Sequence, residues 1–469
     1  MRISIQQVVA TIAVLGLGCL STHICVGGNL PNILYINADD HGVMDVGYNN
    51  PIFNTPNLDR LRSEGMLFTE AYAPAANCAP SRACVLSGQW GPRHGVYTVT
   101  NSDRGKAKDR KIIPTKNTQY LGLENLTIPA ALQAGGYKTI HLGKWHIGED
   151  PVEQGIDINV GGDRTGSPKG GYFAPFNEGS MERFDNEYPK GTHRVDIFAD
   201  QAIRFLRESG DQPFFMHLAF YAVHTPIQPV KEFVANYEGK DVSAGYGSMV
   251  EKMDQGIGKI LDELDTLGLR ENTLIVFCSD NGGIRKLSKQ DPYRSGKGSY
   301  FEGGIRVPLL VSWKGRVEPN SSCATPVSGI DFFPTLLEAA GLSEPEGKQL
   351  DGKSLLPLLE QREGFPERAL FWHFPVYLQK YAGKGDDSHD PLFRTRPGSV
   401  VRMGKWKLHE YFEDGRLELY DLDNDTGERK NVAASHPEQA ARLYRLLKDW
   451  RSEIEAPVPT EQNPKYQGK

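Results

Sequence analysis

The chain has 469 residues, of which 39% are hydrophobic and 24% are charged, and its formal net charge is −6. This composition is typical of a globular protein with enough residues for one large domain and a smaller one. The negative net charge argues against nucleic acid as the main partner. An anionic substrate would have to be attracted by a local basic pocket, because the overall charge repels it.

The first residues have the features of an export signal. Arg2 supplies a positive charge, residues 8–20 form an apolar run too short to span a bilayer comfortably, and the small residues Gly27 and Gly28 follow. We therefore expect residues 1–28 to be a signal peptide. This places the mature protein in a periplasm or outside the cell, with no membrane span after the signal is cleaved. No later segment is apolar enough to cross a membrane.

Two alternatives for this segment stay open. It could remain as an uncleaved anchor, or Cys19 could become the lipid-bearing residue of a lipoprotein, although Gly16 stands where a lipoprotein signal has leucine. Apart from Cys78, three cysteines follow the signal on segments that look buried. They are Cys84, Cys278 and Cys323. An odd number of such residues argues against a disulfide framework.

Short apolar runs alternate with helical patterns up to about residue 365, which predicts a mostly parallel α/β sheet flanked by helices. The expected strands are 33–36, 138–140, 214–218, 274–278 and 307–313. The expected helices, marked by caps or by apolar residues at helical spacing, are 55–65, 127–136, 197–206 and 249–264. We expect this sheet to form a catalytic domain over residues 29–365.

The composition changes after about residue 365, and short strands with turn signals follow. The expected strands are 400–402, 405–411 and 417–420, with a hairpin turn at Asp414-Gly415. A final helix is expected after Ser435, where apolar residues recur on one face. Residues 366–469 are therefore predicted to form a smaller α+β subdomain. Its polar end, from Pro457 onward, is predicted to be loose.

Residues 78–88 form the most informative motif, with the sequence Cys-Ala-Pro-Ser-Arg-Ala-Cys-Val-Leu-Ser-Gly. Pro80 suits the first turn of a helix and Gly88 suits its C-terminal cap. Cys78 then lies at the helix N-terminus, where free backbone N–H groups bind oxyanions. Arg82, one turn further along, could present a two-pronged fork to two oxygens of an anion such as sulfate. The alternative is a buried structural cysteine beside a helix start.

Carboxylate and amide side chains follow two of the expected strands. Asp39 and Asp40 come after the first strand, and Asp280 and Asn281 come after strand 274–278. Ligand crevices in open α/β sheets form at these strand ends. Four oxygen ligands suit Ca²⁺, and suit Mg²⁺ less well. Either pair alone could equally be turn residues.

The 78–88 motif resembles the defining motif of the type I sulfatases of the alkaline phosphatase superfamily. Residues 135–139 with 143–148, and residues 295–308, are similar to further blocks of that family, in the family's order. The resemblance extends from about residue 32 to residue 432. Departures are slight, such as Ser87 where threonine is commoner. An alkaline-phosphatase-like fold is what this resemblance implies.

The resemblance also implies an activity and a modified residue. Members of the family hydrolyse sulfate monoesters to an alcohol and sulfate, and we expect an exported enzyme that acts on sulfated carbohydrates or small molecules. In the family the cysteine equivalent to Cys78 is oxidised to Cα-formylglycine by a separate maturation enzyme. Calcium is then expected to be bound by the four oxygen-ligand side chains together with the modified Cys78, that is, by Asp39, Asp40, Asp280, Asn281 and Cys78.

Roles for five further residues come from the same resemblance. Lys144 and Lys297 correspond to ligands of the sulfate oxygens, and His146 corresponds to the partner of the formylglycine hydroxyls. His224 corresponds to the histidine that faces the bridging oxygen of the ester. Arg82 is expected to support the nucleophilic oxygen. Glu302 and Arg306, in the same block as Lys297, have a simpler interpretation as a structural ion pair.

Two rival functions are considered. A phosphodiester or phosphonate monoester hydrolase would share the formylglycine and the metal ligands, although His146 and its motif favour sulfate. A glycan-binding protein with an unmodified Cys78 would lack activity, and the full set of family residues argues against it.

Two further clusters of basic residues lie in loop-like stretches, and they have two interpretations. One cluster follows the Cys78 helix and comprises Arg104, Lys106, Lys108, Arg110, Lys111 and Lys116; a second comprises Arg394 and Arg396. Both could be solvated loops, or they could bind further sulfates or carboxylates of a polysaccharide.

Overall fold

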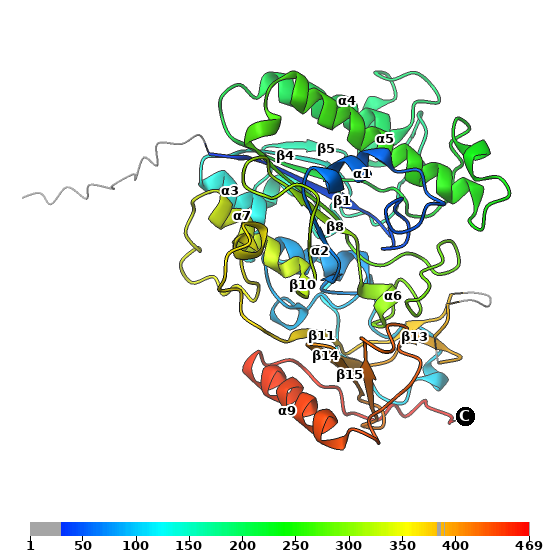
Figure 1. Cartoon of the computed structure of the whole chain (residues 1–469). Coiled ribbons are helices and arrows are strands. Elements are labelled where there is room, and N and C mark those ends of the chain that lie inside the picture. Colours follow the sequence, from blue (N-terminus) through cyan, green and yellow to red (C-terminus); the bar gives the residue numbers. More distant parts are fainter. Residues whose placement is uncertain (1–29, 382–385, 389, 469) are drawn as a thin grey trace, which may run out of the picture.

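The structure, a computed structural model, describes residues 30–381, 386–388 and 390–468. Its centre is an eight-stranded sheet in the order β5-β4-β6-β1-β7-β8-β2-β9 (Figure 1). The strands are β1 (Asn32–Ala38), β2 (Met66–Phe68), β4 (Lys138–Gly143), β5 (Ile158–Val160), β6 (Phe214–Ala219), β7 (Thr273–Ser279), β8 (Leu309–Ser312) and β9 (Ser321–Cys323). All neighbours are parallel except β8, which runs antiparallel to β7 and β2. The predicted mostly parallel α/β sheet is confirmed.

The central strands are mostly apolar because helices cover both faces of the sheet. Every residue of β1, β6 and β7 is buried. One face packs against α1 (Pro56–Ser63), α4 (Arg194–Glu208) and α5 (Ala244–Thr266). The other packs against α2 (Cys78–Ser87), α3 (Ile128–Ala134), α7 (Phe332–Ala339) and α8 (Leu356–Leu359). A short helix, α6 (Glu302–Ile305), lies in the last block of the sulfatase-like motifs.

The caps expected from the sequence set the limits of two helices. Helix α2 starts at Cys78 and ends at Gly88, which has the left-handed φ of 67° that favours glycine. Helix α3 starts after Thr127, whose Oγ1 accepts a hydrogen bond from the Ala130 N–H at 3.3 Å. The predicted helix after Cys78 and its C-terminal cap at Gly88 are therefore confirmed.

A second, antiparallel sheet follows in the order β11-β14-β15-β16. Its strands are β11 (Leu370–Phe374), β14 (Gly398–Met403), β15 (Trp406–Tyr411) and β16 (Leu417–Asp421), and α9 (Pro437–Glu453) packs on one face (Figure 1). This confirms the expected antiparallel strands and final helix, whereas β11 was not foreseen. The division into domains at residue 365 stays a prediction. Two two-stranded pairs complete the structure: β3 (Ala71–Tyr72) with β10 (Val327–Ser328), and β12 (Leu378–Gln379) with β13 (Phe393–Thr395).

The polar end of the chain is not loose, contrary to the prediction. The Ile113 N–H donates to the Glu461 carbonyl at 2.8 Å, and the Asn463 N–H donates to the Lys111 carbonyl at 2.9 Å. The Asn463 side-chain amide also donates to the carbonyl oxygens of Ala107 and Arg110. Backbone pairing therefore fixes a segment that has no apolar pattern to reveal it.

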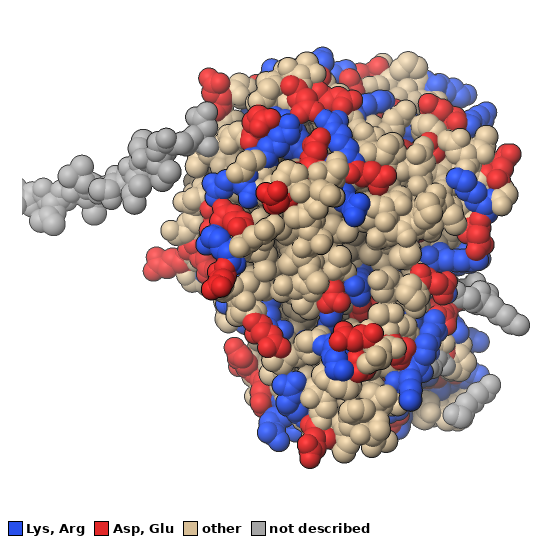
Figure 2. Space-filling model, in the orientation of Figure 1, with Lys and Arg blue, Asp and Glu red and all other residues tan. Residues whose placement is uncertain are grey.

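The expected signal peptide lies outside the described residues. Among the described helices none is both long enough and apolar enough to span a membrane. Cys84, Cys278 and Cys323 are free thiols, in agreement with the expectation of no disulfide framework. Acidic and basic side chains are interspersed over the face shown in Figure 2.

Candidate active site

Four strand ends converge on one edge of the central sheet. Because β1 lies between β6 and β7, the residues that follow these strands become neighbours. The Asp39 N–H donates to the Ala222 carbonyl at 3.0 Å, and the Asp280 N–H donates to the Ala38 carbonyl at 3.1 Å. The Lys144 N–H donates to the Ala219 carbonyl, at the end of β6. These backbone bonds hold residues from distant parts of the chain at one place.

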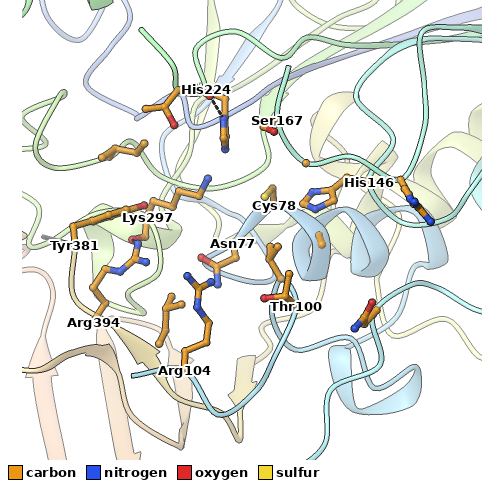
Figure 3. Close-up of a pocket in the computed structure, with 18 of the residues that line it drawn as sticks. Asn77, Cys78, Thr100, Arg104, His146, Ser167, His224, Lys297, Tyr381 and Arg394 are labelled. Atoms are coloured by element: carbon orange, nitrogen blue, oxygen red, sulfur yellow. Dashed lines mark hydrogen bonds between the residues drawn. The ribbon is translucent and has the colours of Figure 1, made fainter. Parts of the chain in front are cut away.

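Cys78 is the first residue of α2 and is only 3% exposed. It lines a cavity of about 690 Å³ together with His146, His224 and Lys297. Figure 3 shows these four side chains around the same space. The helix start, with its free N–H groups, therefore meets two imidazoles and an ammonium group, which is an environment suited to an anion.

Three carboxylates of the site each have a cationic partner. Lys144 Nζ lies 2.6 Å from Asp39 Oδ2, and Arg82 Nε lies 2.8 Å from Asp280 Oδ2. Lys297 Nζ contacts both oxygens of Asp40. These contacts are buried, and a buried charge is costly unless it is paired and hydrogen-bonded. These cationic partners offset the repulsion among the three neighbouring carboxylates.

The pKa values follow from this pairing. Burial opposes ionisation of Asp40, but the charge of Lys297 outweighs it and holds the pKa of that carboxyl below its usual value. Burial also lowers the pKa of Lys144 and Lys297, yet the facing carboxylates raise both above the ordinary lysine value. Both lysines are therefore charged at neutral pH.

Arg82 is less available than the sequence suggested. Besides the bond to Asp280, its Nη1 donates to the Lys144 carbonyl at 2.8 Å. The expected fork for two sulfate oxygens stays a prediction, and it would have to use the remaining N–H groups of Nη1 and Nη2. Nη2 alone is buried without a partner among the described residues. Arg82 links the carboxylate after β7 to the backbone after β4, and both N–H groups of its Nη2 stay without a partner among the described residues.

His146 is buried, and its Nδ1 has no hydrogen-bond partner among the described residues. Its backbone has a φ of 66°, and its N–H donates to the Asp163 carbonyl at 3.0 Å. Burial, with Lys144 and Arg82 nearby, lowers the pKa of the imidazole well below its usual value. The motif did not reveal Gly166, where a Cβ would lie 2.4 Å from the His146 ring. Glycine at position 166 therefore leaves room for the His146 ring.

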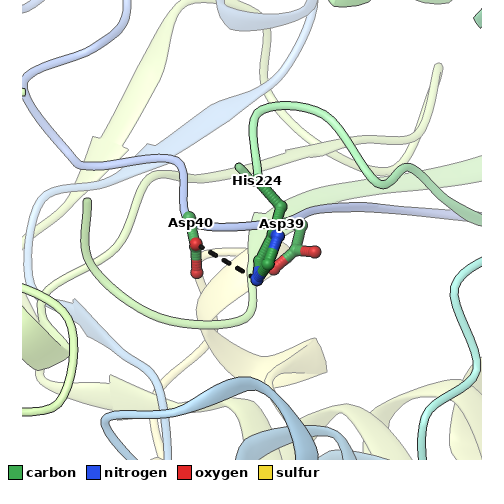
Figure 4. A group of neighbouring side chains, drawn as sticks. All are labelled: Asp39, Asp40 and His224. Atoms are coloured by element: carbon green, nitrogen blue, oxygen red, sulfur yellow. Dashed lines mark ion pairs between the residues drawn. The ribbon is translucent and has the colours of Figure 1, made fainter. Parts of the chain in front are cut away.

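His224 lies beside the first pair of carboxylates (Figure 4). Its Nε2 is 3.9 Å from Asp40 Oδ2, and its Nδ1–H donates to the Thr225 carbonyl at 2.6 Å. Burial lowers the pKa of His224 to about 3, although Asp40 opposes this. The imidazole is therefore neutral in the free protein, with the lone pair on Nε2.

The donor set fits a hard divalent cation. Ligand atoms of Asp39, Asp40 and His224 lie within 4.8 Å of one another. Asp39 Oδ1 and Asn281 Oδ1 are buried acceptors without a hydrogen-bond donor among the described residues, while the Asn281 amide donates to Asp40 Oδ1 at 2.9 Å. Buried acceptors without donors are costly unless a cation satisfies them. Oxygen atoms predominate, as calcium prefers.

Comparison with known proteins identifies this arrangement. The sulfatase family model matches residues 31–342, which is more than half of the chain. The chain belongs to the sulfatase family. As a sulfatase it is a sulfuric ester hydrolase, and the alternative of a glycan-binding protein without activity is set aside. A second model, described as the C-terminal part of N-sulphoglucosamine sulphohydrolase, matches residues 296–454.

Individual relatives cover nearly the whole sulfatase chain. It is 32% identical to a sulfatase of Formosa agariphila over 91% of this chain and 90% of the relative. It is 32% identical to human N-acetylgalactosamine-6-sulfatase over 92% and 87%, respectively. The crystal structure of Ps i-CgsB in complex with k-i-k-neocarrahexaose is similar with a TM-score of 0.73 and 26% identity, over 94% of this chain and 95% of that one. The alkaline-phosphatase-like sulfatase fold is thereby confirmed.

Proposed function

We propose that this sulfatase hydrolyses sulfate monoesters of carbohydrates after export, with a formylglycine made from Cys78 and a bound calcium ion. The observation that supports this most directly is the position of Cys78. It is a free cysteine at the start of a buried helix, on the wall of a cavity that His146, His224 and Lys297 also line. A nucleophile in such a place has cationic and hydrogen-bonding groups around the oxyanion that it must attack.

Two groups complete the proposed site. Oxidised to Cα-formylglycine, Cys78 would supply a hydrated aldehyde whose hydroxyl oxygen is the nucleophile toward sulfur. A calcium ion would be held by Asp39, Asp40, Asp280 and Asn281, and would supply positive charge beside the sulfate oxygens. The buried acceptors Asp39 Oδ1 and Asn281 Oδ1 support this assignment.

Lys144, Lys297 and Arg82 stabilise negative charge in the proposed site. Lys144 and Lys297, which pair with Asp39 and Asp40 in this structure, would bind sulfate oxygens. Arg82 keeps Asp280 in place and leaves Nη2 for an oxygen atom at the nucleophile. Charge fixed before the reaction is worth more than charge that must reorganise during it.

The two histidines move protons. His146 is neutral because burial lowers its pKa, so it can accept a proton from a hydroxyl beside it. His224 donates a proton from Nε2 to the departing alcohol oxygen. Its Nδ1–H is already engaged with the Thr225 carbonyl, which leaves Nε2 for this step. Because the pKa of His224 is low in the free protein, the imidazole must take up this proton from solvent when the substrate binds. The negative charge of the bound substrate favours the imidazolium.

Sulfated carbohydrates are the proposed substrate class because of the relatives. Human N-acetylgalactosamine-6-sulfatase is 32% identical, and Ps i-CgsB was solved with a neocarrahexaose. Mouse steryl-sulfatase is 30% identical over 89% of this chain. Membership of the family therefore does not by itself establish a carbohydrate substrate. The signal-like residues 1–28 support export of the enzyme.

The proposal is tested with protein made together with a formylglycine-generating enzyme. Turnover is measured on nitrophenyl sulfate, on sulfated mono- and oligosaccharides, and on a phosphonate monoester. We expect hydrolysis of the sulfate esters and much slower hydrolysis of the phosphonate. A reversed preference would instead support the phosphonate hydrolase that shares this fold.

A further inference from the structure

The wall of the Cys78 cavity has charges of one sign. Its described lining includes no aspartate or glutamate, but five basic side chains: Arg104, Arg164, Lys286, Lys297 and Arg394. Lys297 pairs with Asp40, and Arg164 pairs with Glu149 at the surface. A loop and the strand β13, which are far apart in sequence, supply the other arginines, Arg104 and Arg394. Such a concentration is unexpected in a chain with a net charge of −6.

The structure fixes the loop of Arg104 next to the strand of Arg394. Residue 103 forms a bridge with Tyr377, whose N–H donates to the Ser102 carbonyl at 2.8 Å. At Gly105, where φ is 83°, a Cβ would lie 2.7 Å from Phe393, the neighbour of Arg394. The Arg110 guanidinium donates to the Gly105 carbonyl at 2.8 Å. The position of Arg104 beside the cavity is thus built by its own loop.

Hydrogen bonds hold Arg394 in place, but none of the described residues gives it a counter-charge. Its Nε donates to the Gln379 carbonyl and its Nη1 donates to the Lys297 carbonyl, both at 3.0 Å. Its guanidinium carbon lies 3.6 Å from the centre of the Tyr381 ring. A Cβ at Gly298 would approach Nη1 to 2.9 Å, so glycine there leaves room for the guanidinium. Backbone carbonyls and a ring orient the group while its charge stays available.

Arg104 has no hydrogen-bond or ion-pair partner among the described residues, and the charged side chain that affects its pKa most is another arginine. Burial, and then the positive charge of Arg394, lower the pKa of Arg104 below the usual arginine value. Two guanidinium groups that repel each other beside a cavity without carboxylates are stabilised by an anion between them. In Figure 3 both groups lie on the same side of the cavity, apart from Cys78.

We propose that Arg104 and Arg394 form a second anion-binding site, which holds a sulfate or carboxylate of the same glycan molecule whose scissile sulfate lies at Cys78. This inference rests on the proposed function and narrows its substrate class. The preferred substrate is a glycan fragment with at least two anionic groups. A substrate with one sulfate fills only the inner site.

The remaining basic residues of the two sequence clusters do not line this cavity. Arg396 pairs with Asp390 and Glu413, and Arg110 clasps its own loop. Lys106 is exposed, lies two residues from Arg104 and is absent from the cavity wall. Lys106→Gln removes one positive charge from the same loop outside the cavity, so it is a matched control for Arg104→Gln.

The test compares the wild type with Arg104→Gln and Lys106→Gln, all carrying formylglycine. Four probes are used: nitrophenyl sulfate, a neutral disaccharide with one sulfate, a disaccharide with two sulfates, and a disaccharide with one sulfate and one uronate. We expect Arg104→Gln to lower kcat/KM by about 10- to 100-fold on one or both doubly charged sugars, mainly through KM. The first two probes and the Lys106→Gln variant should be unaffected. The wild-type preference should also weaken with added salt.

The two doubly charged probes distinguish a sulfate site from a carboxylate site. Equal losses for Arg104→Gln on all four probes, or no loss on any, would overturn the inference while the sulfatase proposal stands. A wild type that hydrolyses none of the four probes would instead reject the proposed function, and this inference with it. Melting temperatures of the three proteins show whether any loss comes from the fold. Arg394 is unsuitable as the single test because it also holds the Lys297 carbonyl.

Discussion

Lys297 Nζ lies 2.6 and 2.8 Å from the two carboxylate oxygens of Asp40, although 257 positions separate the two residues in the sequence. This ion pair joins a proposed sulfate ligand to a proposed calcium ligand. A cation that binds Asp40 releases Lys297, and a sulfate that binds Lys297 releases Asp40. The two ligands should therefore bind with positive cooperativity, since each removes the competitor of the other.

The first prediction concerns calcium affinity. Lys297→Met should bind calcium about tenfold more tightly than the wild type, because a competing positive charge is removed from Asp40. Titration calorimetry measures the dissociation constants directly, without turnover. Lys286→Met is the control, since Lys286 lines the same cavity but does not contact Asp40. Weaker calcium binding by Lys297→Met would show that the two cations do not compete.

The second prediction concerns chelation. Each carboxylate of the site has its own cationic partner, so the metal-free protein should remain folded. Removal of calcium should abolish turnover but lower the free energy of unfolding only by the linkage amount, about 2.7 kcal/mol when calcium had been present at 100 times its dissociation constant. Calorimetric melting at several calcium concentrations checks this. Unfolding of the chelated protein at room temperature would contradict it.

The third prediction concerns the nucleophile. Protein produced together with the maturation enzyme should contain formylglycine at Cys78, as mass spectrometry of the peptide with residues 78–88 can show. Cys78→Ala should fold normally and lose essentially all turnover, because alanine keeps the start of α2 intact. Cys84→Ala, which alters the other cysteine of the motif, is the control and should retain activity. Full activity in protein with an unmodified thiol at Cys78 would refute the assignment.

The fourth prediction separates the roles of His224 and Lys297. A sugar alkoxide needs a proton when it leaves, whereas nitrophenolate does not. His224→Ala should therefore slow sulfur–oxygen cleavage by about 10²–10⁴-fold on a sugar sulfate, and much less on nitrophenyl sulfate. Single-turnover kinetics isolate this step. Equal losses on both substrates would mean that His224 positions the sulfate, and Lys297 would become the leading candidate for the acid.

The fifth prediction concerns acid stability. Burial lowers the pKa of His373 to about 3. Both nitrogens of the neutral ring form hydrogen bonds, since Nε2–H donates to the Pro457 carbonyl and Nδ1 accepts from the Ser399 hydroxyl. This stability is present above pH 6.5, where the unfolded chain also has a neutral histidine. It is lost as the pH falls toward 3, because only the unfolded chain takes up the proton.

The loss amounts to about 1.4 kcal/mol per pH unit for one such histidine. His373→Gln should reduce the slope of unfolding free energy against pH between 6 and 4 by that amount, as urea titrations at each pH can measure. The exposed His436→Gln is the control. An unchanged slope in His373→Gln would show that this histidine is protonated in the folded protein.

Much of the fold was predictable because its signals are local. The buried runs of β1, β6 and β7 and the cap at Gly88 are visible in the sequence alone. Strands of two or three residues, such as β2 and β10, are not, because they depend on partners far away in the chain. The antiparallel direction of β8 likewise depends on its neighbours.

The site was predictable to a similar degree. Residues that follow parallel strands must meet at one edge, and this brings Asp39 and Lys144 together. The sequence could not show that these two would pair, since it assigned one to a metal and the other to sulfate. Nor could it separate Arg104 and Arg394, which line the cavity, from the basic residues around them. That distinction depends on how distant loops pack.

The end of the chain, from Glu461 to Gln467, holds residues 107–113 through backbone and amide hydrogen bonds. This is the segment that follows Arg104. A chain synthesised from its N-terminus therefore makes the loop of Arg104 long before residues 461–467, which hold that loop in place. Helix α2, with Cys78, can pack as soon as the central sheet exists. In the order of synthesis, the Arg104 side of the cavity is therefore completed after the helix that carries Cys78.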